Sequence, residues 1–157
     1  MDVRFINPFL EGTTSVLKTM AFVDPKPGKP YLKNDGLARG DVSGIIGFTG
    51  TLSGSMALSF SENAILKIVS NMFGEEIREI NGDIEDAVGE ITNIISGVAR
   101  KKLESFGLTV LAAIPTVVSG KGHSIKHVLG GTSIVIPFET EDGPFVVDVC
   151  MSEIKQA

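Results

Sequence analysis

The clearest pattern along the chain is a stretch at 83–106 in which apolar residues recur every three or four positions. On a helical wheel, at about 100° per residue, these gather on one side: Ile84, Val88, Ile91, Ile95 and Val98. The opposite side carries polar or small residues within an arc of roughly 60°: Asp86, Glu90, Asn93 and Gly97. The pattern predicts an amphipathic helix with its apolar side in the core and a narrow polar side toward solvent or a partner. Basic residues at 100–102 suit the negative end of its dipole, and Gly107 is a natural stop.

Two other helices are predicted from residues that start and stop helices. The first is expected at 8–22, because Asn7 is a favourable N-cap and Pro8 suits the first helical position. The second is expected at 62–73, with the preceding serine as its cap and Gly74 as its end.

The remaining apolar runs predict antiparallel strands. Residues 41–60 have the pattern of a hairpin with glycines around its turn. Three further runs are rich in β-branched and aromatic residues, at 110–118, 134–138 and 145–149. The proline-rich segment at 24–30 fits neither a helix nor a central strand, so we expect a loop there.

The order of these elements predicts an α+β fold with an internal repeat. A long helix followed by antiparallel strands occurs twice, at about 8–60 and 83–149. Aligning the two helices places Glu11 over the glutamate of the polar side and Thr14 over its asparagine. The first copy keeps the carboxylate and lacks the amide, which indicates a degenerate site.

Composition narrows the class of protein. The chain of 157 residues, with 43% hydrophobic and 21% charged residues, is expected to form a single domain over 1–157. A net charge of -5 argues against a nucleic-acid binder. One cysteine, no leader pattern at the first residues and no apolar run of about 20 residues favour a soluble, cytoplasmic protein with no membrane segment.

Common catalytic signatures are missing from the sequence. It contains no Walker A lysine motif, no Gly-x-Ser-x-Gly elbow and no His-Glu-x-x-His pair. Cys150 ends an apolar strand, which favours a buried structural thiol. His123 and His127 have i, i+4 spacing, but glycines around them favour a loop or edge strand, and no further ligand completes a metal site.

The polar side of the long helix is the best candidate for function. Asparagine is a mediocre residue inside a helix, and Gly89 and Gly97 each cost about 1 kcal/mol relative to alanine. A purely structural helix would gain from replacing them, although a solvated face also accounts for Glu90 and Asn93. Asp86 lies in the first turns, where it can instead complement the helix dipole.

The spacing Asp86-x3-Glu90-x2-Asn93, followed after 21 residues by Pro115, resembles the signature of the CheC/CheX/FliY phosphatases of bacterial chemotaxis. The rest of the chain is similar to the CheX branch in five segments, at 7–11, 25–31, 40–47, 114–123 and 135–140. The resemblance implies a CheC-like fold in which two long helices pack on the sheet. CheC carries glutamate and asparagine on both repeat helices, so Thr14 implies one site per subunit, as in CheX.

The activity implied by this resemblance is hydrolysis of the aspartyl phosphate on a phosphorylated CheY-like response regulator. Asn93 would orient the attacking water, and Glu90 would dock on the active-site lysine of the regulator. Pro115 would be a structural member of the motif, with Asp86 and Gly97 in supporting roles. The chain would need no cofactor of its own because the regulator supplies Mg²⁺. CheX proteins also form homodimers, which implies a homodimer here.

Two other functions are compatible with the same polar side. It could serve a non-catalytic binding module that holds a phosphorylated receiver domain or another signalling partner. It could also be the surface of a plain scaffold or dimerisation domain, in which case changing Glu90 or Asn93 would alter only stability.

Overall fold

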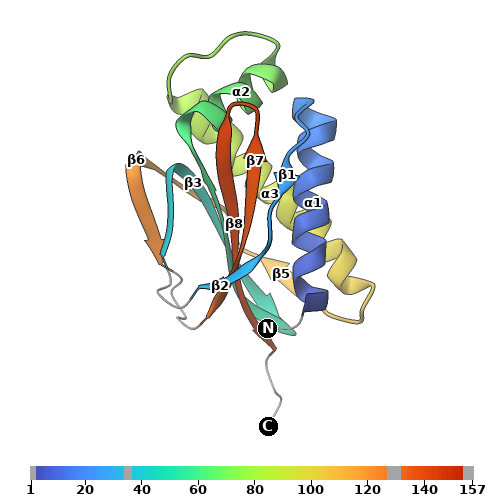
Figure 1. Cartoon of the computed structure of the whole chain (residues 1–157). Helices are drawn as coiled ribbons and strands as arrows, with labels where there is room; N and C mark the ends of the chain where they lie inside the picture. Colours follow the sequence, from blue (N-terminus) through green and yellow to red (C-terminus); the bar gives the residue numbers. More distant parts are fainter. Residues whose placement is uncertain (1–2, 34–36, 127–131, 154–157) are drawn as a thin grey trace.

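The computed structural model describes residues 3–33, 37–126 and 132–153. In this part of the chain, two long helices lie side by side on one face of an antiparallel sheet (Figure 1). The elements follow the chain in the order α1 Val3–Ala21, β1 Lys26–Pro27, β2 Tyr31–Lys33, β3 Leu37–Gly50, β4 Leu52–Phe60, α2 Glu62–Phe73, α3 Gly82–Glu104, β5 Val110–Ala112, β6 Thr116–Lys126, β7 Ser133–Thr140 and β8 Gly143–Glu153. The α+β class and the predicted order of helices and strands are confirmed. The repeat relation between 8–60 and 83–149 stays a prediction.

The sheet is built around two hairpins that meet at its centre. Its strand order is β1-β7-β8-β4-β3-β5, with β2 also paired to β7 and β6 also paired to β3. The hairpins β3–β4 and β7–β8 join where β4 pairs with β8 in antiparallel register. The expected hairpin at 41–60 is confirmed, and its turn is tighter than expected because β4 starts at Leu52, two residues after Gly50 ends β3.

Helix α3 forms close to the predicted bounds and is packed as the periodicity requires. The side chain of Asn81 caps it by accepting a hydrogen bond from the Ile84 N–H at 3.1 Å. Most residues of the predicted apolar side are fully buried, namely Ile84, Val88, Ile91 and Ile95. The placement of Val98 on the core side is wrong, because this side chain is 41% exposed at the outer edge of the contact with Gly12 of α1.

Helix α1 starts five residues earlier than expected, at Val3, so Pro8 lies inside the helix and Asn7 is not its N-cap. A proline in a helix removes one backbone hydrogen bond and can cost about 3 kcal/mol. Here Phe5 and Ile6 are buried before it, and burying such side chains stabilises by about 1.5–3 kcal/mol each. Tertiary packing therefore extends the helix through a residue that local preference places at its start.

Helix α2 has the predicted bounds, and Gly74 ends it in the left-handed conformation, but its cap differs from the prediction. The hydroxyl of Ser61 donates to the Pro144 carbonyl at 2.6 Å and does not cap the helix. Instead, Asp41 on β3 accepts a hydrogen bond from the Glu62 N–H at 2.8 Å. A distant carboxylate thus replaces the neighbouring serine.

Asp41 ties three elements together, because it also accepts a hydrogen bond from the Gly122 N–H on β6 at 3.0 Å. The Gly122 and Glu62 N–H groups lower the pKa of Asp41 from its ordinary value of 3.8. A carboxyl whose pKa is lowered by folding stabilises the protein above the ordinary pKa and loses that contribution as the pH falls through the lowered value.

Asp41→Asn is therefore expected to reduce the free energy of unfolding by about 1 kcal/mol at pH 7. The difference from wild type should shrink as the pH falls below 3.8. Urea unfolding of both proteins between pH 7 and pH 3 measures this, with Glu141→Gln on the exposed β7–β8 turn as the control. An equal difference at every pH would contradict the role given to the carboxylate.

The single strand expected at 110–118 is wrong, because the structure divides it into β5 and β6. Both pair with β3, and the Ala113 N–H donates to the Gly47 carbonyl at 3.0 Å between them. Pro115 has no N–H to contribute to a strand ladder, so pairing is interrupted and resumes at Thr116. The segment 24–30 is a loop except for β1, a two-residue strand at the sheet edge.

Candidate functional site

The polar side predicted for the long helix is a surface of the folded protein. Asp86, Glu90 and Asn93 are exposed and Gly97 is half-buried; we call these four residues the α3 polar face. Glu90 and Asn93 are one helical turn apart, and side chains at this spacing are neighbours on a helix surface. The predicted grouping of these residues is confirmed.

Two glycines let α3 lie directly on the sheet and fix the direction of this face. A Cβ atom at Gly44 on β3 would collide with the hydroxyl of Thr92, which donates to the Val88 carbonyl at 2.7 Å. A Cβ at Gly89 would lie 3.3 Å from Val117 on β6. Gly89 thus serves packing inside the molecule, whereas Gly97 has open space around it apart from one side-chain atom of Arg100.

The functional groups of the α3 polar face are free to meet another molecule. In the described part of the chain, neither the Glu90 carboxylate nor the Asn93 side-chain amide has a hydrogen-bond or ion-pair partner. The backbone carbonyl of Asn93 accepts from the Ser96 hydroxyl at 2.9 Å, which leaves the amide unused. The Glu90 carboxylate and the Asn93 amide therefore lie next to each other on the helix surface. Within the described chain, neither group stabilises the fold through a hydrogen bond or an ion pair.

Pro115 lies immediately before β6 and is half-buried, as expected for a residue that shapes the start of that strand. The contact between Val117 and Gly89 places the beginning of β6 along α3. Ile114, next to the proline, is 89% exposed. The sequence motif therefore joins two elements that are neighbours in the fold.

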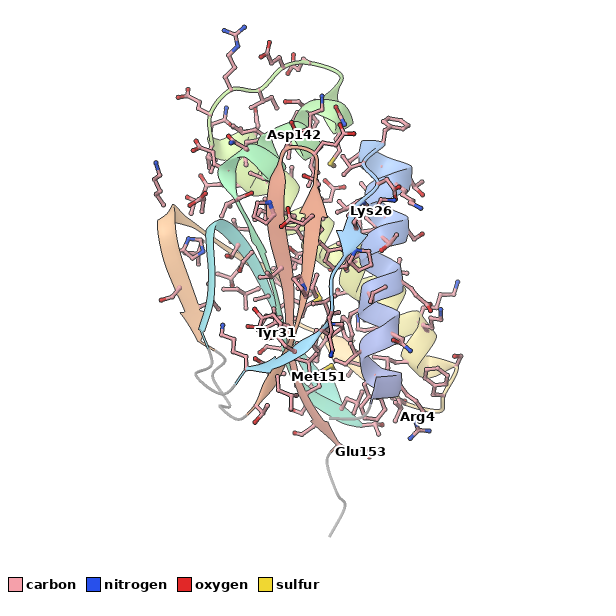
Figure 2. The ribbon with its side chains drawn as sticks, viewed as in Figure 1. Arg4, Lys26, Tyr31, Asp142, Met151 and Glu153 are labelled. Carbon is pink, nitrogen blue, oxygen red and sulfur yellow. The ribbon has the colours of Figure 1, made fainter. Side chains whose placement is uncertain are left out.

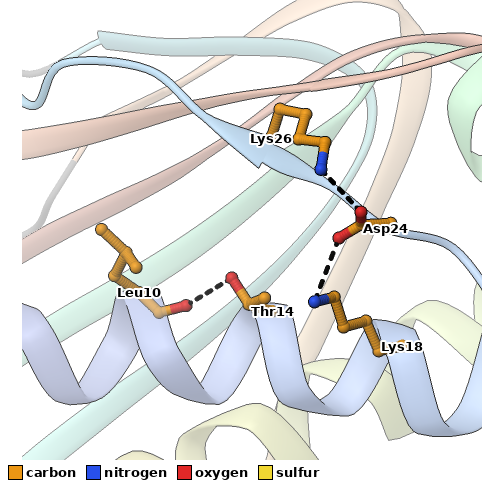
Figure 3. A network of polar contacts seen from close by, with 5 residues as sticks. All are labelled: Leu10, Thr14, Lys18, Asp24 and Lys26. Carbon is orange, nitrogen blue, oxygen red and sulfur yellow. Dashed lines mark hydrogen bonds and ion pairs between the residues drawn. The ribbon is translucent and has the colours of Figure 1, made fainter.

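The corresponding face of α1 makes contacts within the molecule, and Figure 3 shows the hydrogen bond of Thr14 and the ion pairs of Asp24 beside it. Glu11 forms an ion pair with Lys102 at the end of α3, and the Thr14 hydroxyl donates to the Leu10 carbonyl at 3.1 Å. Figure 2 shows Lys26 beside α1, where β1 passes this helix. Asp24 bridges two lysines here, Lys18 at 3.2 Å and Lys26 at 2.6 Å.

A cavity of about 620 Å³ lies between α1 and this segment, lined by Leu10, Glu11, Thr14, Ser15, Lys18, Thr19, Asp24, Pro25, Lys26 and Pro27. Its side chains combine both signs of charge and offer no amide at the position equivalent to Asn93. The face of α1 thus lacks the free carboxylate and amide of the α3 polar face.

Other candidate chemistry does not gather into a site. Within the described ranges, no three His, Cys, Asp or Glu side chains form a group that could hold a metal ion. His123 on β6 bonds to the Ser43 hydroxyl and the Gly120 carbonyl, both at 2.7 Å, and so ties β6 to the sheet. His127 lies outside the described residues. Cys150 is buried, as predicted, and burial raises the pKa of its thiol.

Arg100 is a residue near the α3 polar face that the sequence did not single out, beyond its suitability for the helix dipole. It is half-buried, and its Nε atom is buried without a hydrogen-bond partner in the described part of the molecule. A favourable interaction with the helix dipole explains why a basic residue lies at this end of α3. It does not explain why the Nε donor of Arg100 is buried without a hydrogen-bond partner in the described chain.

Comparison with known proteins assigns the family. The family model of the chemotaxis phosphatase CheX matches residues 42–139, more than half of the chain and including the α3 polar face and Pro115. The chain belongs to the chemotaxis phosphatase CheX family. A curated relative, the CheY-P phosphatase CheX of Thermotoga maritima, is 34% identical over 127 residues, which are 80% of this chain and 82% of the relative.

Solved structures of the CheX family share this fold. CheX from Desulfovibrio desulfuricans is 44% identical, with a TM-score of 0.89 over 94% of this chain and 99% of that one. CheX from Borrelia burgdorferi, solved as a complex with CheY, BeF3 and Mg²⁺, is 25% identical, with a TM-score of 0.79 over 95% of this chain and 98% of that one. These likenesses confirm the CheC-like fold expected from the sequence.

None of the described helices meets the length and hydropathy needed to cross a membrane.

Proposed function

We propose that this protein hydrolyses the aspartyl phosphate of a phosphorylated CheY-like response regulator at the α3 polar face. The family supplies the class of reaction, and the Thermotoga maritima relative is named as a CheY-P phosphatase. The observation that carries the proposal is the exposed pair Glu90 and Asn93, which has no internal partner among the described residues.

Asn93 orients the attacking water in this proposal. Its side-chain amide offers a donor and an acceptor at once, so it can hold a water molecule in line with the P–O bond without changing its protonation. An acyl phosphate is already labile, and positioning alone can supply a large rate acceleration. This chemistry needs neither a nucleophile nor a metal site in the chain.

Glu90 provides the docking contact. Its carboxylate lies one turn before Asn93 and is free to pair with the active-site lysine of the regulator. Such a pair would set the depth and angle at which the amide of Asn93 approaches the phosphoryl group. Asp86 adds negative charge at the same face, and Gly97 leaves room for the regulator to approach the helix backbone.

The regulator supplies Mg²⁺ in this mechanism. The Borrelia burgdorferi CheX structure contains CheY, BeF3 and Mg²⁺ together, which supports a metal that comes with the partner. The test of the whole proposal is release of phosphate from a phosphorylated CheY-type receiver by wild type and by Asn93→Ala. Tight binding of the phosphorylated receiver without faster phosphate release would identify a binding module instead.

The face of α1 is expected to stay inactive even when its missing amide is supplied. Thr14→Asn restores the residue type of Asn93, but Glu11 remains paired with Lys102. Phosphate release by Thr14→Asn should therefore equal that of wild type within about twofold, and Asn93→Ala/Thr14→Asn should be as slow as Asn93→Ala alone. Recovery of activity in the double variant would show that the α1 face is a working site.

The homodimer stays a prediction of the family resemblance, and a cytoplasmic location stays a prediction from the composition and the first residues of the sequence. Sedimentation equilibrium of the full chain tests the first, since a single species of twice the 16.6 kDa chain mass is expected. A monomer at all concentrations up to those used for the phosphatase assay would contradict it.

A further inference from the structure

The charge of α3 changes sign along its length. Its first half carries acidic side chains, Asp83, Glu85, Asp86 and Glu90, and its last turns carry Arg100, Lys101 and Lys102, followed by Glu104 as the last residue. Lys102 is paired with Glu11, and Lys101 is exposed. Arg100 differs from both because it is half-buried and its Nε atom has no hydrogen-bond partner in the described part of the chain.

Arg100 points along the same side of the helix as Asn93. The two are seven residues apart, which corresponds to about 10 Å along the axis and a rotation of only about 20°. The guanidinium Nη2 atom lies 3.9 Å from the place of a Cβ at Gly97, between the two residues. Since helical side chains lean toward the N-terminus, Arg100 folds back over the open surface of Gly97 toward Asn93.

The donors of this guanidinium have no partner among the described residues. Its Nε atom is buried without a hydrogen-bond partner, and no carboxylate in the described ranges pairs with the side chain. Buried donors are almost always satisfied in proteins, and a guanidinium fork matches two oxygen atoms of an anion. The space beside Gly97, where Nη2 of Arg100 is the one described side-chain atom within 4 Å of the place of a Cβ, is where such an anion can reach the Nη2 end of the guanidinium.

We propose that Arg100 binds an oxyanion of the response regulator when the regulator docks on the α3 polar face. This inference rests on the proposed function and adds a second charged contact to it. Glu90 offers a negative group and Arg100 a positive group on either side of Asn93. A regulator whose cation pairs with Glu90 and whose oxyanion pairs with Arg100 can therefore dock in only one direction along α3. The reverse direction would place like charges against each other.

The oxyanion is a surface carboxylate beside the regulator's active site or the phosphoryl group itself. The two sources are separated by binding measurements with the regulator in its unphosphorylated form and in its beryllofluoride-activated form. Arg100→Glu should weaken both forms by a similar factor if the group is a carboxylate, and only the activated form if it is the phosphoryl group.

Steady-state phosphate release tests the proposal with a matched control. Arg100→Glu is expected to raise KM for the phosphorylated regulator at least tenfold while kcat stays within about twofold, and Arg100→Lys should recover part of the affinity. Lys101→Glu makes the same charge change one residue along and should alter KM less than twofold. A KM for Arg100→Glu within twofold of that for Lys101→Glu would overturn the proposal.

Thermal unfolding and a parallel assay of Asn93→Ala complete the test. A role of Arg100 limited to the helix dipole would lower the unfolding midpoint of Arg100→Glu and leave KM and the Kd for the activated regulator unchanged, which overturns the proposal. Should Arg100→Glu fail to fold, Arg100→Gln is measured in its place. A large loss of activity in Asn93→Ala with no effect at Arg100 contradicts only this inference, whereas unchanged activity of Asn93→Ala contradicts the proposed function.

Discussion

Asn93→Ala is expected to lower kcat for phosphate release from a phosphorylated CheY-type regulator by about 100-fold or more. Removing the amide takes away the only group of the α3 polar face that can both donate to and accept from the attacking water. Correct positioning of a reacting group is worth several powers of ten in rate, so its loss dominates over any change in binding. Stability should hardly change, because the side chain is exposed and has no internal partner in the described chain.

A matched control for this variant lies on another helix. Asn63→Ala removes an exposed asparagine from α2, outside the α3 polar face, and should release phosphate at the wild-type rate. Both variants are measured with the same phosphorylated regulator over a range of concentrations, so that kcat and KM are separated. A decrease in Asn93→Ala that lies entirely in KM would assign the residue to binding and not to the chemical step.

Glu90→Lys is expected to reduce kcat/KM by about 100-fold, mostly through a higher KM. The change places a positive charge against the active-site lysine of the regulator, and like charges facing each other across an interface cost several kcal/mol. The effect should weaken at high salt, because screening reduces repulsion between partly exposed charges.

Glu79→Lys provides the control for net charge, since it makes the same change at an exposed position before α3. It should leave KM within about twofold of wild type. An equal rise in KM for both variants would show that the overall charge of the protein, and not the Glu90 contact, controls association. A loss in kcat alone for Glu90→Lys would rule out the docking role.

Features set by short-range physics were predictable from the sequence. The bounds of α2 followed from a start signal and a stop signal thirteen positions apart, Ser61 and Gly74, and Gly74 adopts the expected left-handed conformation. The α3 polar face followed from periodicity, because a helix that buries Ile91 and Ile95 must expose Glu90 and Asn93. The bounds of α2 and the α3 polar face both depend on residues that are close together in the chain. For such residues, the spacing along the sequence determines which side of the helix each side chain faces.

Features set by distant contacts were not predictable in this way. Phe5 and Ile6 extend α1 past Pro8 because the core has room for them, which only the fold reveals. The sequence suggested that a purely structural helix would gain from replacing Gly89, yet this glycine packs on Val117 of a strand that starts 27 residues later in the sequence. Asp41 caps a helix that starts 21 residues after it.

The candidate site shows the same division. Its central pair could be named from the sequence, whereas the engagement of Glu11 by Lys102 required the packing of α1 against α3. Arg100 looked like one of three basic residues at a helix end, and its half-burial, its contact beside Gly97 and its buried Nε atom distinguish it from Lys101. The sequence thus located the α3 polar face, the site that we propose, and the structure shows which neighbouring charges in the described chain are free to meet a partner.

Single-turnover dephosphorylation, with the protein in excess over a phosphorylated CheY-type regulator, tests the central claim most directly. At saturation, wild type should release phosphate about 100-fold or more faster than the regulator alone. Asn93→Ala should bind the beryllofluoride-activated regulator with a Kd within about threefold of wild type and yet leave the spontaneous rate unchanged. Saturated wild type that does not accelerate phosphate release, or Asn93→Ala that accelerates it as well as wild type, would contradict catalysis by the α3 polar face.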